Sequence, residues 1–282
     1  MSNPAAAEQA LKDGDAAQAL KLLTEQVRAH PQDAKLRVFL FQLLCVLGQW
    51  SRALNQLNVA LELDAAMLPM VQTYREAIAC EALRMQVFAG QKVPLLFGEP
   101  EPWVALLIEA LLREGRGEPD AARQLRAQAL EQAPASAGSV DGQAFTWIAD
   151  ADSRLGPVIE AVINGRYYWL PWNRVSRVDI DPPEDLRDAV WMPAHFQFTN
   201  GGEVVGLIPT RYPDTDIAAG GLAALSRSTD WREAPSGLCV GLGQRLFATD
   251  VADFALMDVR SVLLAEPAIE DPAAAPAPAD AG

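Results

Sequence analysis

The 282-residue sequence contains few of the side chains that usually carry catalysis or bind metal ions. Histidine occurs only at His30 and His195, and the three cysteines, Cys45, Cys80 and Cys239, lack CxxC spacing. His30 stands at an expected helix end, where a cation interacts favourably with the helix dipole. His195 lies in an expected strand without the further ligands that a zinc site needs. We therefore expect no metal site and no cofactor, and free thiols in a reducing compartment.

Long apolar runs are also missing. No stretch approaches the roughly 18 apolar residues that a membrane span requires. Residues 1–18 lack both the basic and the apolar region of a signal peptide. We therefore expect a cytoplasmic protein that does not bind a membrane.

Positive charge is scarce. Lysine and arginine together number 23 against 37 acidic residues, so the formal net charge is -14 at pH 7. The phosphates of nucleic acids and the surface of an anionic membrane would repel such a chain. Because half of the residues are hydrophobic, packed cores are expected. The composition favours proteins as partners and excludes nucleic acid.

Sequence motifs of common enzymes are absent as well. The chain has no GxxxxGK[ST] and no GxSxG motif, so neither a phosphate-binding loop nor a nucleophile elbow is expected. The stretch DADSRLGPVIEA resembles a calcium loop, but Leu155 and Ala161 stand where such a loop needs glycine and glutamate. An Asx-type turn before a strand is the simpler interpretation.

The first half of the chain contains internal repeats. GDAAQALKLLTEQVRAHP from Gly14 aligns with GQWSRALNQLNVALELDA from Gly48, 34 residues later, which is the tetratricopeptide period. GEPDAARQLRAQALEQAP from Gly117 is a third copy, whose first helix opens at Trp103. Between the second and third copies, residues 70–90 indicate one long helix in the place of a degenerate repeat. Because neither helix of a unit buries its apolar stripe alone, the units are expected to stack as a short solenoid.

Such a solenoid typically receives a helix or peptide in a groove lined by the first helix of each unit. In the second unit, the groove-facing positions are expected at helical spacing. Our candidates for partner binding are Lys35, Val38, Gln42, Cys45 and Val46. Packing of several of these against the next helix is the alternative.

From Phe145 onward the period changes to that of β-strands, which are separated by turn residues. The expected strands cover residues 144–148, 156–163, 166–172, 174–180, 194–198, 203–209, 238–248 and 254–264. Asn164-Gly165 predicts a type I′ hairpin, and a short helix is expected to begin near Leu186. The fold class is therefore α+β, with N-terminal tetratricopeptide-like helical repeats followed by a small antiparallel β domain.

We expect three parts in the chain: a repeat domain over residues 1–135, the β domain over 136–265, and a disordered Pro/Ala tail over 266–282. Residues 133–143 have the composition of a flexible linker. Trp147, Trp169 and Trp172 stand among the first β segments, however, and a small β domain cannot bury so many rings alone. We therefore expect the β domain to pack on the last helical unit, near residues 125–130.

The stretch IPTRYPDT presents Arg211 and Tyr212 between two prolines. Arginine and tyrosine are frequent in interface hot spots, so both are further candidates for partner binding. The alternative is that Arg211 pairs with Asp150 or Asp152 and stabilises the fold. These two interpretations are equally supported by the sequence.

Five motifs, in order, carry a family resemblance: LFQLLCVLGQWSRALNQL, YREAIACEALR, FTWIADADSRLGPVIEAVINGRYYWLPW, PEDLRDAVWMPA and IPTRYPDT. Between about residue 10 and residue 262 the chain resembles the ImpE family, also called TagJ, of type VI secretion accessory proteins. The resemblance implies a cytoplasmic, non-enzymatic component of that apparatus. It further implies association with the small subunit of the contractile sheath and, through this subunit, with the ATPase that disassembles contracted sheaths.

Three functions follow for testing. The first is an adaptor that binds a helix of the small sheath subunit. The second is an enzyme of unknown reaction whose acid–base cluster is Asp150, Asp152 and Arg211, although no nucleophile and base pair supports it. The third is a scaffold that associates with itself through the solenoid.

Overall fold

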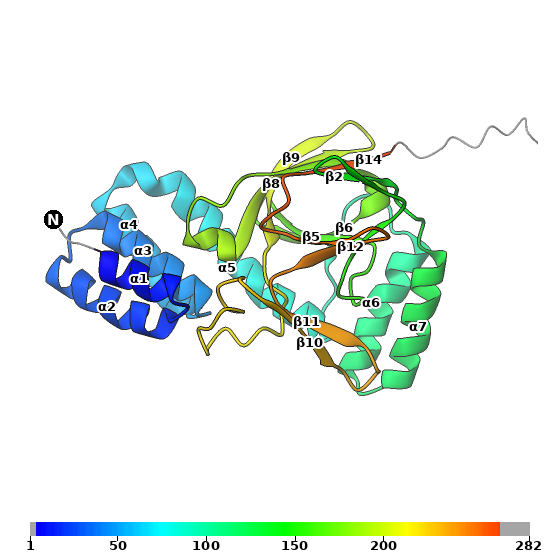
Figure 1. The fold of residues 1–282 in the computed structure, drawn as a ribbon, viewed down its shortest axis with the longest axis horizontal. Helices are drawn as coiled ribbons and strands as arrows, with labels where there is room; N and C mark the ends of the chain where they lie inside the picture. The colour runs from blue at the N-terminus through cyan, green and yellow to red at the C-terminus, as the bar shows by residue number, and fades with distance from the viewer. Residues whose placement is uncertain (1–3, 266–282) are drawn as a thin grey trace, which may run out of the picture.

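The computed structural model describes residues 4–265 and confirms the α+β fold, with helices first and sheets after them (Figure 1). The expected tail over residues 266–282 lies outside the described residues. No helix of the described part is long and apolar enough to cross a membrane. The helices are α1 (Ala5–Lys12), α2 (Ala16–Ala29), α3 (Ala34–Val46), α4 (Trp50–Leu63), α5 (Leu68–Phe88), α6 (Pro102–Gly115) and α7 (Pro119–Gln132), with the 3₁₀ helix η1 (Ala65–Met67) before α5.

The first two repeats form as expected. Helices α1 and α2, and then α3 and α4, pack as antiparallel pairs. Gly14 and Gly48 turn the chain between the helices of each pair with positive φ angles of 82° and 63°, a region that glycine enters without steric cost. Ala19 and Ala53 are fully buried where the helices cross. The 34-residue alignment thus located both pairs.

The third repeat also forms a helix pair, α6 and α7, but it does not stack on the first two. Helices α1–α4 lie on one side of the β region and α6 and α7 on the other, with the long α5 extending between them (Figure 1). The first two repeats therefore stack as expected, and the third pair does not continue the expected short solenoid. Gly90 and Gly115 lie so close together that an added Cβ on either would meet backbone within 3 Å, and this contact positions α6 beside the end of α5.

The strands of the β domain begin before residue 144, where the first strand was expected. Strand β2 (Gly138–Val140) lies inside the expected linker and pairs with both β14 (Ser261–Leu264) and β3 (Gln143–Phe145). The linker residues are therefore part of a sheet. The remaining strands are β1 (Leu95–Leu96), β4 (Ile148–Asp150), β5 (Val158–Ile163), β6 (Arg166–Pro171), β7 (Val175–Ile180), β8 (Trp191–Phe198), β9 (Glu203–Pro209), β10 (Thr229–Glu233), β11 (Cys239–Gly243), β12 (Leu246–Thr249) and β13 (Asp253–Ala255), with the 3₁₀ helices η2 (Trp172–Arg174) and η3 (Leu186–Ala189).

Three sheets form within residues 4–265. The main sheet has nine strands in the order β1-β6-β5-β9-β8-β7-β14-β2-β3, and the smaller sheets are β10-β11 and β13-β12-β4. All pairs are antiparallel except β1 with β6, which is parallel. Asn164 and Gly165 have φ angles of 50° and 70° between β5 and β6, as the predicted type I′ turn requires.

The β region packs on the helices through aromatic rings, as expected, but at a different place. The ring centroids of Trp169 and Phe88 on α5 are 6.2 Å apart, and Trp191 lies 5.9 Å from Trp50 at the start of α4. Trp169 and Trp172 are fully buried, whereas Trp147 is 40% exposed. These ring contacts are with α4 and α5, and η3 packs on α3. The expected contact with residues 125–130 of α7 is seen where Leu130 lies beside Gly156.

Candidate partner-binding groove

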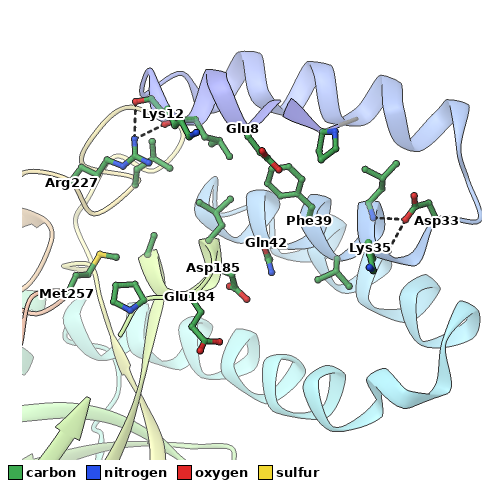
Figure 2. A pocket seen from close by; sticks show the side chains of 18 residues that line it. Glu8, Lys12, Asp33, Lys35, Phe39, Gln42, Glu184, Asp185, Arg227 and Met257 are labelled. Atoms are coloured by element: carbon green, nitrogen blue, oxygen red, sulfur yellow. Dashed lines mark hydrogen bonds between the residues drawn. The ribbon is translucent and has the colours of Figure 1, made fainter. Parts of the chain in front are cut away.

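A groove with a volume of about 770 Å³ lies between the first two repeats and a segment of the β region (Figure 2). Its sides are α1, α3 and residues 183–189, which include η3. The lining residues are Pro4, Glu8, Leu11, Lys12, Asp33, Lys35, Leu36, Val38, Phe39, Gln42, Pro183, Glu184, Asp185, Leu186, Ala189, Leu225, Arg227 and Met257. More than half of these residues are apolar, and charged residues make up most of the remainder.

Helix α3 forms the floor of the groove. Lys35, Val38, Phe39 and Gln42 lie on one face because residues three and four apart share a side of a helix. Val38 and Phe39 are half-buried, and Lys35 is exposed. Three of the residues predicted to face a partner, Lys35, Val38 and Gln42, therefore line one groove. Their contact with a partner stays a prediction.

Cys45 and Val46, which were also predicted to face the groove, do not reach it. Both side chains are fully buried, because the last turn of α3 is covered by the β region. Burial raises the pKa of the Cys45 thiol far above its usual value. The backbone carbonyls of Cys45 and Val46, at the end of α3, both accept hydrogen bonds from Arg211.

Arg211 and Tyr212 are structural side chains in this fold, contrary to the expectation that they are presented to a partner. Arg211, only 5% exposed, donates from Nη1 to the carbonyl oxygens of Val46 (2.6 Å) and Ala224 (2.7 Å). Burial lowers the pKa of its guanidinium to about 10. The buried Tyr212 hydroxyl accepts the Leu246 N–H at 3.0 Å. The cation sits at the negative end of the α3 dipole and joins the β region to the second repeat.

The second wall of the groove was not anticipated from the sequence. Asp185 and Asp188 form a capping box around η3, and the Asp188 carboxylate accepts the N–H groups of Glu184 (2.7 Å) and Asp185 (2.9 Å). These bonds hold the wall in one conformation. The short helix was correctly predicted from the stretch DPPEDLRDAV. The packing of η3 against α3 depends on the tertiary fold and cannot be predicted from the local sequence.

The loop between β9 and β10 attaches the first repeat to the same β region. The Arg227 side chain donates to the carbonyl of Leu11 at 2.7 Å, near the C-terminus of α1. The Gly220 carbonyl accepts the N–H of Ala16 at 3.3 Å. Together with Arg211 on α3, these contacts fix the positions of both groove helices relative to the wall.

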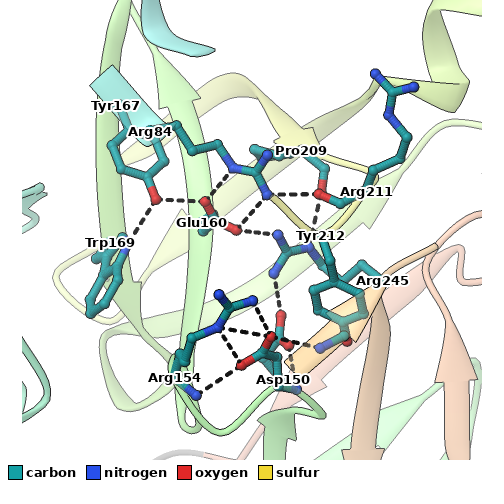
Figure 3. A network of polar contacts seen from close by, with 12 residues as sticks. Arg84, Asp150, Arg154, Glu160, Tyr167, Trp169, Pro209, Arg211, Tyr212 and Arg245 are labelled. Atoms are coloured by element: carbon teal, nitrogen blue, oxygen red, sulfur yellow. Dashed lines mark hydrogen bonds and ion pairs between the residues drawn. The ribbon is translucent and has the colours of Figure 1, made fainter. Parts of the chain in front are cut away.

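A buried network of charges lies between α5 and the sheets (Figure 3). Glu160 is its centre: it accepts from Arg84 Nε at 2.7 Å and from the Tyr167 hydroxyl at 2.5 Å, and it pairs with Arg245. Burial alone would raise the pKa of Glu160, but the two arginines outweigh it and lower the pKa to about 2. The network is buried. Because it pairs Arg84 on α5 with Glu160 on β5, it holds the helical and β regions together.

The proposed acid–base cluster does not exist as an accessible site. Asp150 pairs with Arg245, and Asp152 pairs with Arg154 at 2.6 Å and accepts the Gly241 N–H at 3.0 Å. Both carboxylates are buried. Arg211 stabilises the fold, as the structural alternative proposed, but it does so through backbone carbonyls and contacts neither Asp150 nor Asp152. Among the described residues, no group of three or more histidine, cysteine or acidic side chains is arranged to hold a metal ion.

A groove formed by helices of the first two repeats and closed by a wall from the β region is typical of repeat proteins of the protein-interaction class. Comparison with known proteins specifies the family. The model of the ImpE protein family matches residues 142–263, and a tetratricopeptide-repeat model matches residues 10–73. The chain belongs to the ImpE family, as its resemblance in sequence predicted.

Two relatives support this assignment. The chain is 51% identical over 256 residues, 91% of its length and 90% of the relative's, to the type VI secretion system accessory component TagJ of Pseudomonas aeruginosa. The crystal structure of a protein from Vibrio parahaemolyticus matches with a TM-score of 0.84 at 27% identity, covering 93% of this chain and 98% of that one. The relationship therefore spans both the helical and the β regions.

Proposed function

We propose that this chain is a non-enzymatic, cytoplasmic adaptor of the type VI secretion apparatus, and that its groove binds a helix of the small sheath subunit. Through that subunit the adaptor is linked to sheath assembly or to ATPase-driven disassembly. The family membership and the name of the Pseudomonas relative support the type VI role. The net charge of -14 supports a protein partner over nucleic acid or membrane.

The observation that carries the proposal is the groove floor. Val38 and Phe39 present apolar surface from α3 to a cleft of about 770 Å³, within the range of about 300–1,000 Å³ that is common for binding sites. Apolar residues at helical spacing in such a cleft match the apolar face of an amphipathic helix. Lys35 is exposed at one end of this stripe and offers a polar contact, whereas Gln42 at the other end is only 8% exposed.

Titration calorimetry of the full chain with the small sheath subunit of the same type VI system tests the proposal. Val38→Asp places a charge on the apolar floor and is expected to weaken binding by about tenfold or more. Val251→Asp is the matched control, because Val251 is 49% exposed in a turn outside the groove. The control should bind as the unmodified chain does.

Circular dichroism and the thermal unfolding midpoint show whether each variant is folded. The proposal is wrong if the unmodified chain does not bind the small sheath subunit at high micromolar concentration. If binding occurs but Val38→Asp and Val251→Asp have equal affinities, the partner site lies elsewhere on the molecule.

A further inference from the structure

The two sides of the groove differ in charge. The charged lining residues are Glu8, Lys12, Asp33, Lys35, Glu184, Asp185 and Arg227. On the wall segment 183–189, the charged lining residues are Glu184 and Asp185, and both are acidic. Helices α1 and α3 and the residue before α3 contribute both signs, with Glu8, Lys12, Asp33 and Lys35, and the loop between β9 and β10 adds the cation Arg227. Figure 2 shows Glu184 and Asp185 at the edge of the groove opposite Lys12 on α1.

Several of these charges are already engaged inside the protein. The Asp33 carboxylate accepts the N–H groups of Lys35 and Leu36, and the Asp185 carboxylate pairs with Arg187. Arg227 donates to the carbonyl of Leu11. Within residues 4–265, the carboxylate of Glu184 has no hydrogen bond and no ion pair. It is therefore the acidic group of the wall that is available to a partner.

The backbone of Glu184 is also held in a fixed position. Its N–H donates to the Asp188 carboxylate at 2.7 Å, and the two preceding residues, Pro182 and Pro183, restrict the backbone. The neighbouring Leu186 contributes apolar surface to the groove. Because this backbone is already fixed, pairing with a cation restricts only the side-chain rotamers of Glu184.

We propose that Glu184 is a specificity-determining residue of the groove, which selects an amphipathic helix with a lysine or arginine flanking its apolar face. This inference rests on the proposed function of the groove as a helix-binding site. The bound helix places its apolar face on Val38 and Phe39 and its cationic flank against the β wall. The β region thereby contributes directly to recognition, because Glu184 adds an exposed carboxylate beside the apolar surface of Leu186.

Two synthetic 18-residue helical peptides with the same leucine face test the inference. The first carries lysine along one flank and glutamine along the other, and the second has glutamate in place of each lysine. Glu184→Lys in the full chain is expected to weaken binding of the lysine peptide by about three- to tenfold. The glutamate peptide should bind the variant as tightly as the unmodified chain, or more tightly.

Glu62→Lys is the matched control, because Glu62 is exposed on α4 outside the groove, and it should change neither affinity. The inference is overturned if Glu184→Lys affects both peptides equally, or if the lysine peptide does not bind the unmodified chain. Failure of the small sheath subunit to bind, with the peptide pattern intact, would instead reject the proposed function and leave the groove's charge preference standing.

Discussion

Arg84 on α5 and Glu160 on β5 form a bidentate ion pair across the boundary between the helical and β regions. Arg84 Nε and Nη2 lie 2.7 Å and 3.1 Å from the two carboxylate oxygens, and both side chains are buried. The same Arg84 donates to the backbone carbonyl of Arg211 at 2.7 Å. Arg84 and Arg211 thus connect α5, the main sheet and the end of α3, and through α3 they support the groove.

Glu160→Gln is therefore expected to destabilise the whole chain. It leaves Arg84 and Arg245 facing a neutral amide in a buried site, and breaking a buried pair in this way costs about 3–5 kcal/mol. Urea denaturation measures the loss. Glu233→Gln, at an exposed position on β10, is the control and should change the unfolding free energy by less than about 0.5 kcal/mol. Equal effects of the two substitutions would contradict the structural role of the network.

The acid sensitivity of this pair follows from its pKa. The pKa of Glu160 is lowered from 4.5 to about 2 in the folded chain, so the ionised form stabilises the fold fully above pH 4.5. That contribution, about 3 kcal/mol, is lost as the pH falls from 4.5 towards 2. Unfolding free energies of the unmodified chain and of Glu160→Gln should therefore converge over this interval. A constant difference between the two at all pH values would contradict the prediction.

The contribution of Asp150 to the unfolding free energy has the opposite dependence on pH. Burial raises its pKa from 3.8 to about 7 against the attraction of Arg245, because Arg245 is shared with Glu160 and Asp152 lies next to it. Between pH 4 and 7 the folded chain binds a proton at Asp150 that the unfolded chain does not, so the unfolding free energy decreases as the pH rises. Asp150→Asn should remove this slope. Denaturation at a series of pH values measures it, and an unchanged slope would contradict the assignment.

The parts of this fold that depend on local sequence could be predicted, and the parts that depend on distant contacts could not. Gly14 and Gly48 marked the turns of the first two helical pairs, because the 34-residue period can be read directly from the sequence. Asn164-Gly165 marked its hairpin for the same reason. The site of Arg211 could not be predicted, since its acceptors on α3 lie about 165 residues away in the chain.

The candidate site shows the same limit. Helical spacing located Lys35, Val38 and Gln42 on one face, and all three line the groove. The same spacing included Cys45 and Val46, because periodicity does not show where the β region covers the end of α3. The wall at Glu184 was not predicted either, since packing of η3 on α3 brings together segments more than 100 residues apart in the chain. The sequence of neither segment alone shows that the Glu184 carboxylate faces the same groove as α3.

Gly241 on β11 is expected to tolerate no side chain. A Cβ at this position would lie 2.3 Å from the Tyr212 ring, and that ring is fully enclosed. Gly241→Ala should therefore displace Tyr212 and lower the thermal midpoint by several degrees, at a cost of about 1–3 kcal/mol. Gly221→Ala is the matched control, because a Cβ there meets no atom within 4 Å. If the two variants melt together, the close contact is not a constraint on the fold.

Cooperative unfolding of the helical and β regions is the last expectation. The division at residues 135 and 136 stays a prediction, but Trp169 is fully buried against α5, and its indole N–H donates to Tyr167 at 2.8 Å. Trp169→Ala removes packing shared by both regions and should cost about 3–5 kcal/mol. Far-UV dichroism at a helical wavelength and tryptophan fluorescence should then shift to lower denaturant together. Loss of the fluorescence transition alone, with the helical transition unchanged, would show two regions that unfold independently.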